Sequence, residues 1–131
     1  MTENKDQINP DHYKSRACEC IEFTRNLDFS FGNAFKYAWR LGMKDDEAQE
    51  MKKIHWYIRD GLIYRPSQLH AVLCKILLRK LVDIADEFDE DTFLLLLAIL
   101  HAASGATDLL TTYAKENNVY PEAAHAFQFE E

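Results

Sequence analysis

The segment from Gly32 to Lys44 separates into two stripes when it is placed on an α-helix with 3.6 residues per turn. One stripe is polar, recurs at positions i, i+3, i+4 and i+7, and consists of Asn33, Lys36, Tyr37 and Arg40. The other stripe turns toward a different side and consists of Phe31, Phe35, Ala38, Trp39 and Gly42. The segment therefore predicts a helix with one core face and one polar face, which ends near Gly42 in a left-handed cap.

The polar stripe has the chemistry of an oxyanion site. Arginine presents a fixed fork of donors and lysine a mobile point charge, and both recognise phosphate. At the start of the helix, Ser30 is expected to act as the N-cap. Gly32 allows a ligand to approach the backbone amides at the positive end of the helix dipole. Phosphate is the anion that this arrangement favours, and the alternative is that the stripe is only the solvated face of an amphipathic helix.

Composition limits the fold class. The chain has 131 residues, 47% of them hydrophobic, which is enough for one domain that needs no disulfide or metal to fold. Four glycines and three prolines leave little room for a turn-rich β architecture. We therefore expect an all-α fold, a compact bundle of about five to six helices, with residues 1–131 in a single domain.

Charge and cysteine content limit the function. The chain has 15 Lys and Arg against 22 Asp and Glu, a formal charge of -7, so direct binding of duplex DNA or an anionic membrane is not expected and any cationic site must be local. Three cysteines, an odd number, and a polar N-terminus without a secretory signal indicate the cytoplasm. A metal site joining Cys18 and Cys20 to His12 or His70 is disfavoured because the two thiols diverge on a helix, and buried thiols are expected instead.

The spacing predicts further helices with recognisable ends. In chain order they run from about Arg16 to Leu27, from Asp45 or Asp46 to Asp60-Gly61, from Pro66-Ser67 to about Glu87, from Asp89 through His101, and from Asp108 to Asn117. The apolar positions of the helix that follows Asp46 are Ala48, Met51, Ile54, Trp56 and Ile58. The helix that follows Pro66 is expected to be the main packing partner, through apolar positions that include Val72, Ile76 and Leu77.

The run from Leu94 to Leu100 is the most apolar segment, and it is well short of the roughly 20 residues that a bilayer span requires. The helix that contains it is apolar all round, so we expect it to be buried on all sides, in the core or at an interface. Self-association through this helix or its neighbours is therefore expected.

The two helices on either side of Gly42 are joined by so short a loop that they must pack against each other. The second of them has its own polar face, with Glu50, Lys53 and Tyr57 at positions i, i+3 and i+7. The polar faces of both helices are therefore expected to line one cleft, which would contain Lys36, Arg40, Glu50, Lys53 and Tyr57.

Four short motifs follow one another in the first 60 residues. They are Pro10-x-His12-Tyr13, Ile21-Glu22, Gly32-Asn33-x-x-Lys36-Tyr37-x-x-Arg40-x-Gly42-x-Lys44 and Glu50-Met51-x-Lys53-x-x-x-Tyr57. With this spacing, residues 10–60 resemble a small phage-encoded family, mostly of unassigned function, that includes a deoxynucleoside monophosphate kinase of a T-odd coliphage. Residues 62–131 have no counterpart in these motifs and form an additional helical half.

The resemblance implies phosphoryl transfer from a nucleoside triphosphate to a deoxynucleoside monophosphate, in phage nucleotide metabolism in the cytoplasm of the host cell. The implied catalytic residues are Lys36, Arg40, Glu50 and Lys53. The implied substrate-binding residues are His12, Tyr13, Asn33, Tyr37, Lys44 and Tyr57. Glu22 or Glu50 would orient a Mg²⁺ ion or the acceptor, although the kinase member has an aspartate where this chain has Glu50.

Two alternative functions remain open at this point. Glu19-x-x-Glu22 and Glu47-x-x-Glu50 resemble the paired acidic helices of MazG-like nucleoside triphosphate pyrophosphatases, in which carboxylates hold magnesium against a triphosphate. A small acidic helical protein can also be a non-enzymatic phage protein that binds and inhibits a host enzyme or defence complex, with Asp83, Asp86 and Glu87 as candidate contacts. In a purely structural explanation, Glu50 and Lys53 form only an i, i+3 pair, worth a few tenths of a kcal/mol.

Overall fold

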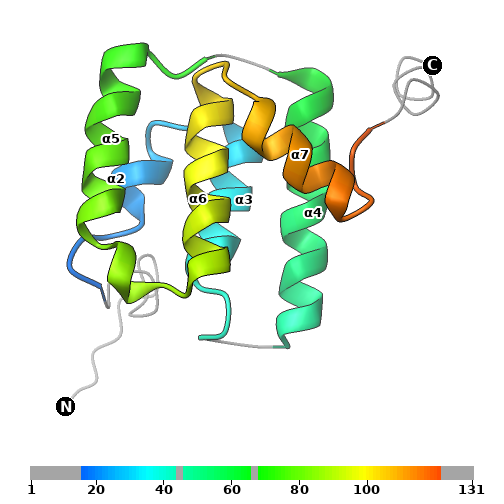
Figure 1. Ribbon diagram of the computed structural model, residues 1–131, viewed down its shortest axis with the longest axis horizontal. Coiled ribbons are helices and arrows are strands. Elements are labelled where there is room, and N and C mark those ends of the chain that lie inside the picture. Colours follow the sequence, from blue (N-terminus) through cyan, green and yellow to red (C-terminus); the bar gives the residue numbers. More distant parts are fainter. Residues whose placement is uncertain (1–15, 44–45, 66–67, 122–131) are drawn as a thin grey trace.

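The computed structural model describes residues 16–43, 46–65 and 68–121. Its elements are α2 (Ile21–Thr24), α3 (Phe29–Trp39), α4 (Glu47–Tyr64), α5 (Ala71–Asp83), the 3-10 helix η1 (Ala85–Glu87), α6 (Glu90–Ala103) and α7 (Asp108–Glu116). Within these described ranges there is no strand, and no helix is long and apolar enough to cross a membrane. The helices form a compact bundle, which confirms the predicted all-α fold class (Figure 1).

Helix α6 stands in the middle of the bundle. Figure 1 shows α5 on one side of it and α4 on the other, with α3 behind it and α7 running obliquely between α6 and α4. Helix α3 packs most extensively on α4 and also contacts α6. The largest fully buried side chains come mainly from these three helices and include Phe35, Trp39, Ile54, Ile58, Leu96, Ile99 and Leu100. The core therefore lies where α3, α4 and α6 meet.

The first predicted helix, residues 16–27, is much shorter than expected, because only Ile21–Thr24 is helical. The Arg16 guanidinium lies 4.1 Å from the ring centroid of Phe88 and 5.3 Å from that of Trp39. This tertiary contact covers the buried indole and competes with the local helical propensity of the residues after Arg16.

The predicted N-cap of the next helix is wrong by two residues. The Asp28 side chain caps α3 by accepting a hydrogen bond from the Phe31 amide at 3.2 Å. Ser30 lies inside the helix, is buried, and donates its hydroxyl hydrogen bond to Asp60 of α4. The predicted end is confirmed, since the helix stops just before Gly42, which has a φ of 85° in the left-handed region that glycine tolerates.

Helix α4 begins as predicted and ends later. Asp46 is its N-cap and accepts from the Ala48 amide at 3.0 Å. Gly61 was expected to stop the helix, but α4 continues through it to Tyr64. Glycine is needed there because the ring of Phe31 on α3 lies against the α4 backbone, and a Cβ at Gly61 would lie 2.5 Å from Cε1 of that ring. A tertiary close approach, and not a helix end, therefore explains this glycine.

We expect Gly61→Ala to lower the free energy of unfolding by about 1–2 kcal/mol, because the clash with Phe31 costs more than the roughly 1 kcal/mol that alanine gains in a helix interior. Urea denaturation followed by circular dichroism measures the change. Gly32→Ala is the matched control, since its Cβ would meet its nearest neighbour, Cβ of Leu27, at 3.6 Å. The control should be neutral or stabilising, and Phe31→Leu should recover stability in the Gly61→Ala background. Equal effects of both alanines would contradict this account.

The later helices agree with prediction in their existence, but α5 differs at both ends. It stops at Asp83, and the 3-10 helix η1 follows where one helix to about Glu87 was predicted. The predicted start at Pro66-Ser67 lies outside the described residues, and α5 begins after His70, whose Nδ1 accepts from the Val72 amide at 3.1 Å. Helix α6 has its predicted cap, because the Asp89 carboxylate accepts from the Thr92 amide at 2.7 Å. The last predicted helix is observed as α7.

Two apolar surfaces that were expected in the core remain exposed. Helix α5 buries Leu77 and Leu81, but Val72 is 60% exposed and Ile76 is 53% exposed. Helix α6 is largely buried, yet Leu94 is half exposed, so the expectation of burial on all sides is wrong at that position. The bundle therefore leaves apolar surface on α5 and α6 without a partner in the described chain.

Candidate functional site

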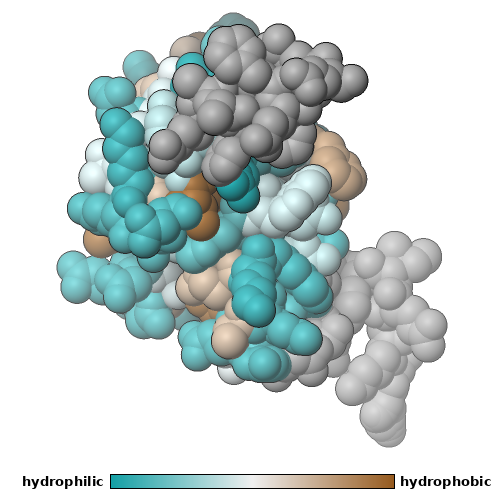
Figure 2. Space-filling view, turned by 90° about the vertical axis from the view of Figure 1, so that its right-hand side faces the viewer, coloured by the Kyte–Doolittle hydropathy of each residue, from teal (hydrophilic) through white to brown (hydrophobic). Residues whose placement is uncertain are grey.

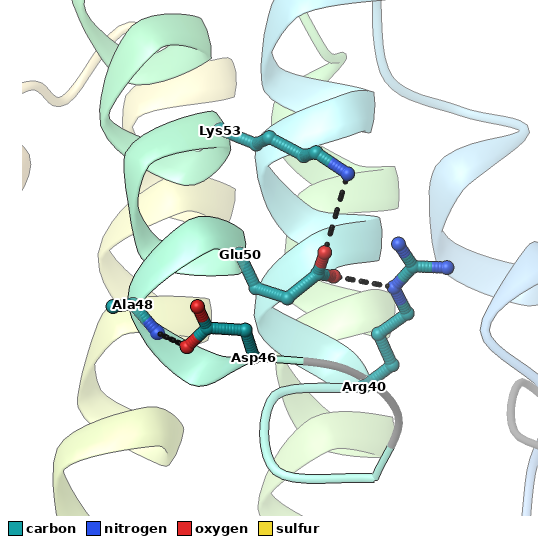
Figure 3. Close-up of polar contacts among 5 residues, drawn as sticks. All are labelled: Arg40, Asp46, Ala48, Glu50 and Lys53. Carbon is teal, nitrogen blue, oxygen red and sulfur yellow. Dashed lines mark hydrogen bonds and ion pairs between the residues drawn. The ribbon is translucent and has the colours of Figure 1, made fainter.

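Glu50 forms a buried ion-pair network between α3 and α4 (Figure 3). The Arg40 Nε donates to Oε1 of Glu50 at 2.8 Å, and the Lys53 Nζ lies 3.3 Å from Oε2. Arg40 and Glu50 are both buried, whereas the Lys53 side chain is about half exposed. The packing of α3 on α4 thus brings together three of the predicted site residues around one carboxylate.

The network keeps Glu50 charged. Burial by itself would raise the pKa of this carboxyl, but the hydrogen bonds from Arg40 and Lys53 outweigh burial and hold the pKa below its usual value. Glu50 also lies in the first turn of α4, where the helix dipole favours a negative charge. The site therefore carries one ionised carboxylate among several cations at neutral pH.

We expect Glu50→Gln to destabilise the protein by roughly 3–5 kcal/mol at neutral pH, because the buried Arg40 guanidinium loses its Glu50 counter-charge. The folded-state pKa of Glu50 is depressed, so its stabilisation is complete above the unfolded-state pKa and is lost as the pH falls through the folded-state pKa. The stability difference between the two proteins should therefore shrink in acid.

Urea denaturation at a series of pH values from neutral to acidic measures this difference. The matched control is Glu47→Gln, an exposed carboxylate in the same first turn of α4, which should change stability by a few tenths of a kcal/mol. A difference between wild type and Glu50→Gln that is constant with pH would show that the ion pairs do not provide the stabilisation.

Tyr37 is surrounded by positive charge. The Arg40 guanidinium lies 4.6 Å from the centroid of its ring, and the ammonium groups of Lys36 and Lys53 lie at 5.1 Å and 5.2 Å. The ring also stacks on Tyr57 of α4, with centroids 6.0 Å apart and an interplanar angle of 13°. Cation–π attraction holds these groups together, so the packing of α3 on α4 brings Lys36, Tyr37, Arg40, Lys53 and Tyr57 into one group of contacting side chains.

Two exposed aromatic residues, Phe29 and Trp56, extend this surface beyond the predicted site residues. Phe29 is 71% exposed and Trp56 is 58% exposed, and each ring meets Tyr57 edge-on, at 5.8 Å and 5.2 Å. The prediction that Trp56 is an apolar core position of its helix is wrong, because Trp56 lies about 160° around the helix from Ile54. The exposure of Trp56 can be predicted from this angle, since Ile54 and Ile58 define the core face of the helix.

We call this surface the cation–aromatic face and define it by Lys36, Tyr37, Arg40, Lys53, Tyr57, Phe29 and Trp56. Figure 2 views the bundle from the α4 side, where white and brown residues lie in patches between teal hydrophilic ones. Exposed aromatic rings next to ammonium and guanidinium groups are suited to a ligand that has both a planar ring and an anionic group.

Asn33 is placed differently from its neighbours on the predicted polar stripe. Its Nδ2 donates to the backbone oxygen of Phe29, one turn earlier in α3, at 2.8 Å. Together with Gly32 and Lys36 it borders a shallow hollow of about 220 Å³ at the start of the helix. Lys36 therefore links this hollow to the cation–aromatic face.

The two predicted metal ligands have separate partners. Glu22 on α2 forms an ion pair with Lys80 of α5 and accepts from the Glu19 amide at 2.8 Å. The hydrogen bond from Lys80 is the main cause that lowers the pKa of Glu22. Glu50 is bound by the two cations described above. Among the described residues, no group of three or more His, Cys, Asp and Glu side chains is placed to hold a metal ion.

Several predicted residues lie elsewhere. His12, Tyr13 and Lys44 lie outside the described residues. Cys18 and Cys20 are free thiols, and burial raises the pKa of Cys20 to about 12, so this thiol stays protonated. The expectation of a buried thiol is confirmed at Cys20.

Residues 8–59 match the sequence pattern of a family described as a protein of unknown function, DUF3310. The match covers the segment that contains α2, α3 and most of α4, and with them the whole cation–aromatic face. No significant match to this chain was found among curated proteins or among solved structures. Residues 8–59 are therefore similar to a family of unknown function, and the phage origin and the kinase activity stay hypotheses.

Proposed function

We propose that the cation–aromatic face binds a nucleotide, and that the protein transfers a phosphoryl group from a nucleoside triphosphate to a deoxynucleoside monophosphate. The observation that carries this proposal is the set of three cations around Tyr37, next to the exposed rings of Phe29 and Trp56. The three cations outnumber the adjoining Glu50 carboxylate, so this face is locally positive in a chain with a formal charge of -7.

Phosphoryl transfer depends mainly on positioning and on neutralising the charge of the phosphate oxygens. Glu50 bonds the Nε of Arg40, and Figure 3 shows the two terminal nitrogens of the guanidinium pointing away from that carboxylate. This orients the donor fork, while Lys36 and Lys53 supply mobile charges beside it. Lys36 and Lys53 are therefore assigned to the phosphates, and the buried Arg40 guanidinium adds its positive charge behind them.

The aromatic residues are assigned to the base. Tyr57 is flanked by exposed rings, and a base stacked on an aromatic side chain gains about 1–3 kcal/mol. Stacking is tolerant of base identity, so this part of the face supplies affinity more than selectivity. The predicted contributions of His12, Tyr13 and Lys44 to substrate binding remain part of the proposal.

Mg²⁺ is expected to arrive with the triphosphate. The cation–aromatic face does not suit a resident metal ion, because the carboxylate that adjoins it, that of Glu50, is already bound by Arg40 and Lys53. A magnesium ion bound to the phosphates of the donor would neutralise charge without needing a protein site of its own.

A calorimetric titration with deoxynucleoside monophosphates and nucleoside triphosphates, with and without magnesium, tests the binding. We expect Lys36→Ala and Lys53→Ala each to weaken binding by about 10- to 100-fold, the cost of one charge-assisted hydrogen bond. Lys52→Ala is the matched control, because Lys52 is exposed on the same helix and makes no contact with Tyr37 among the described interactions. Absence of binding by folded wild type, or equal losses in Lys52→Ala and Lys53→Ala, would refute the site.

The products separate the kinase from the pyrophosphatase alternative. Formation of a deoxynucleoside diphosphate supports transfer, whereas release of monophosphate and pyrophosphate without an acceptor supports a MazG-like enzyme. Ion pairing of Glu22 with Lys80 and of Glu50 with Arg40 favours transfer, since it engages the carboxylates that a pyrophosphatase would use for magnesium.

A second candidate is a non-enzymatic phage protein that binds and inhibits a host or defence complex. The exposed carboxylates of Asp83, Asp86 and Glu87 at the α5–η1 corner favour it. In that case, charge reversal at Asp86 should weaken capture of a host partner while Lys36→Ala leaves it unchanged. The opposite pattern in a pull-down from host extract would exclude this candidate.

A further inference from the structure

A groove of about 640 Å³ lies between α4, α6 and α7, away from the cation–aromatic face. Its apolar surface includes Met51 of α4, Leu94 of α6 and Leu109 of α7, and the two leucines are each about half exposed. Half-exposed leucines along a concave surface are typical of a docking site, because a partner can bury them at a gain of about 25 cal/mol per Å².

The groove is acidic. Four carboxylates line it, from Glu47, Asp89, Asp91 and Glu116, and none of the described residues that line it is basic. A partner that fills the groove must therefore present an apolar strip together with positive charges.

The outer face of α5 has this composition. Val72 and Ile76 are one helical turn apart and are 60% and 53% exposed, and Lys75 and Arg79 are exposed beside them. The Arg79 Nε lies 3.7 Å from Oδ1 of Asp83, but both side chains are largely exposed. Replacing Asp83 by a carboxylate of another molecule therefore costs Arg79 little free energy.

The two surfaces also agree in length and are too far apart to meet within one chain. The span from Val72 to Arg79 is roughly 11 Å of helix, as is the span of α6 from Asp91 to Ala98 that lines the groove. Figure 1 shows α5 at one edge of the bundle, whereas α4 and α7 lie on the opposite side of α6.

We propose that α5 of one copy of this chain docks in the groove between α4, α6 and α7 of a second copy. Lys75 and Arg79 then face the groove carboxylates, while Val72 and Ile76 cover the exposed leucines. Because the two surfaces are different, the contact is heterologous, and copies add head to tail until a ring closes or a chain grows.

Multi-angle light scattering over a range of protein concentrations, together with mixing of two variants, tests this proposal. The α5 variant carries Lys75→Glu and Arg79→Glu, and the groove variant carries Asp91→Lys and Glu116→Lys. Circular dichroism verifies that each variant is folded. The wild-type mass is expected to rise with concentration, whereas each variant alone stays monomeric because one of its two surfaces is lost.

An equimolar mixture of the two variants retains one intact α5 face and one intact groove, so it should form at least a dimer, and the reversed charges on the other two surfaces also attract each other. Lys52→Glu, which changes charge in the same sense as the α5 variant but lies on neither surface, should associate like wild type. A wild type that stays monomeric at all concentrations would overturn the proposal, and so would a mixture that stays monomeric.

Discussion

The buried contact between Arg40 and Glu50 is the interaction on which the N-terminal half of this bundle depends. It joins α3 to α4 through two charges that have both left water, and such a pair is tolerated only when its hydrogen bonds are well made. Lys53 satisfies the second carboxylate oxygen, so the network is complete on the Glu50 side. The same network fixes the direction of the Arg40 guanidinium, so stability and the geometry of the cation–aromatic face have a common origin.

Close packing of α3 on α4 has a second requirement, which is the absence of a side chain at Gly61. The ring of Phe31 occupies the space in which a Cβ would lie, and the helices approach each other closely as a result. From sequence, a glycine after Asp60 indicates a helix end, because local rules contain no information about a ring thirty residues earlier in the chain. The predicted cap at Ser30 is wrong for a related reason. Asp28 and Ser30 are both good caps by residue type, and the contact of Ser30 with Asp60, which distinguishes them, is a tertiary one.

The candidate site was predictable to the extent that helical periodicity determines it. Placing Lys36, Tyr37 and Arg40 on one stripe required only the 3.6-residue repeat, and the short connection after Gly42 predicted which helix they would meet. The edge-on packing of Phe29 against Tyr57 was not predictable, because it depends on where α3 begins relative to the middle of α4. The exposure of Val72, Ile76 and Leu94 was not predictable either. Helical periodicity identifies apolar positions, but which of them find a packing partner depends on how the helices are arranged in the bundle.

The two tryptophans of this chain occupy opposite environments. The indole of Trp39 is fully buried among aromatic rings in the core, whereas that of Trp56 is 58% exposed at the edge of the cation–aromatic face. A buried indole emits at shorter wavelengths than a hydrated one and is shielded from dissolved quenchers such as iodide. The intrinsic fluorescence of the unmodified protein is therefore a sum of two separable signals, one that reports the integrity of the core and one that reports occupancy of the surface.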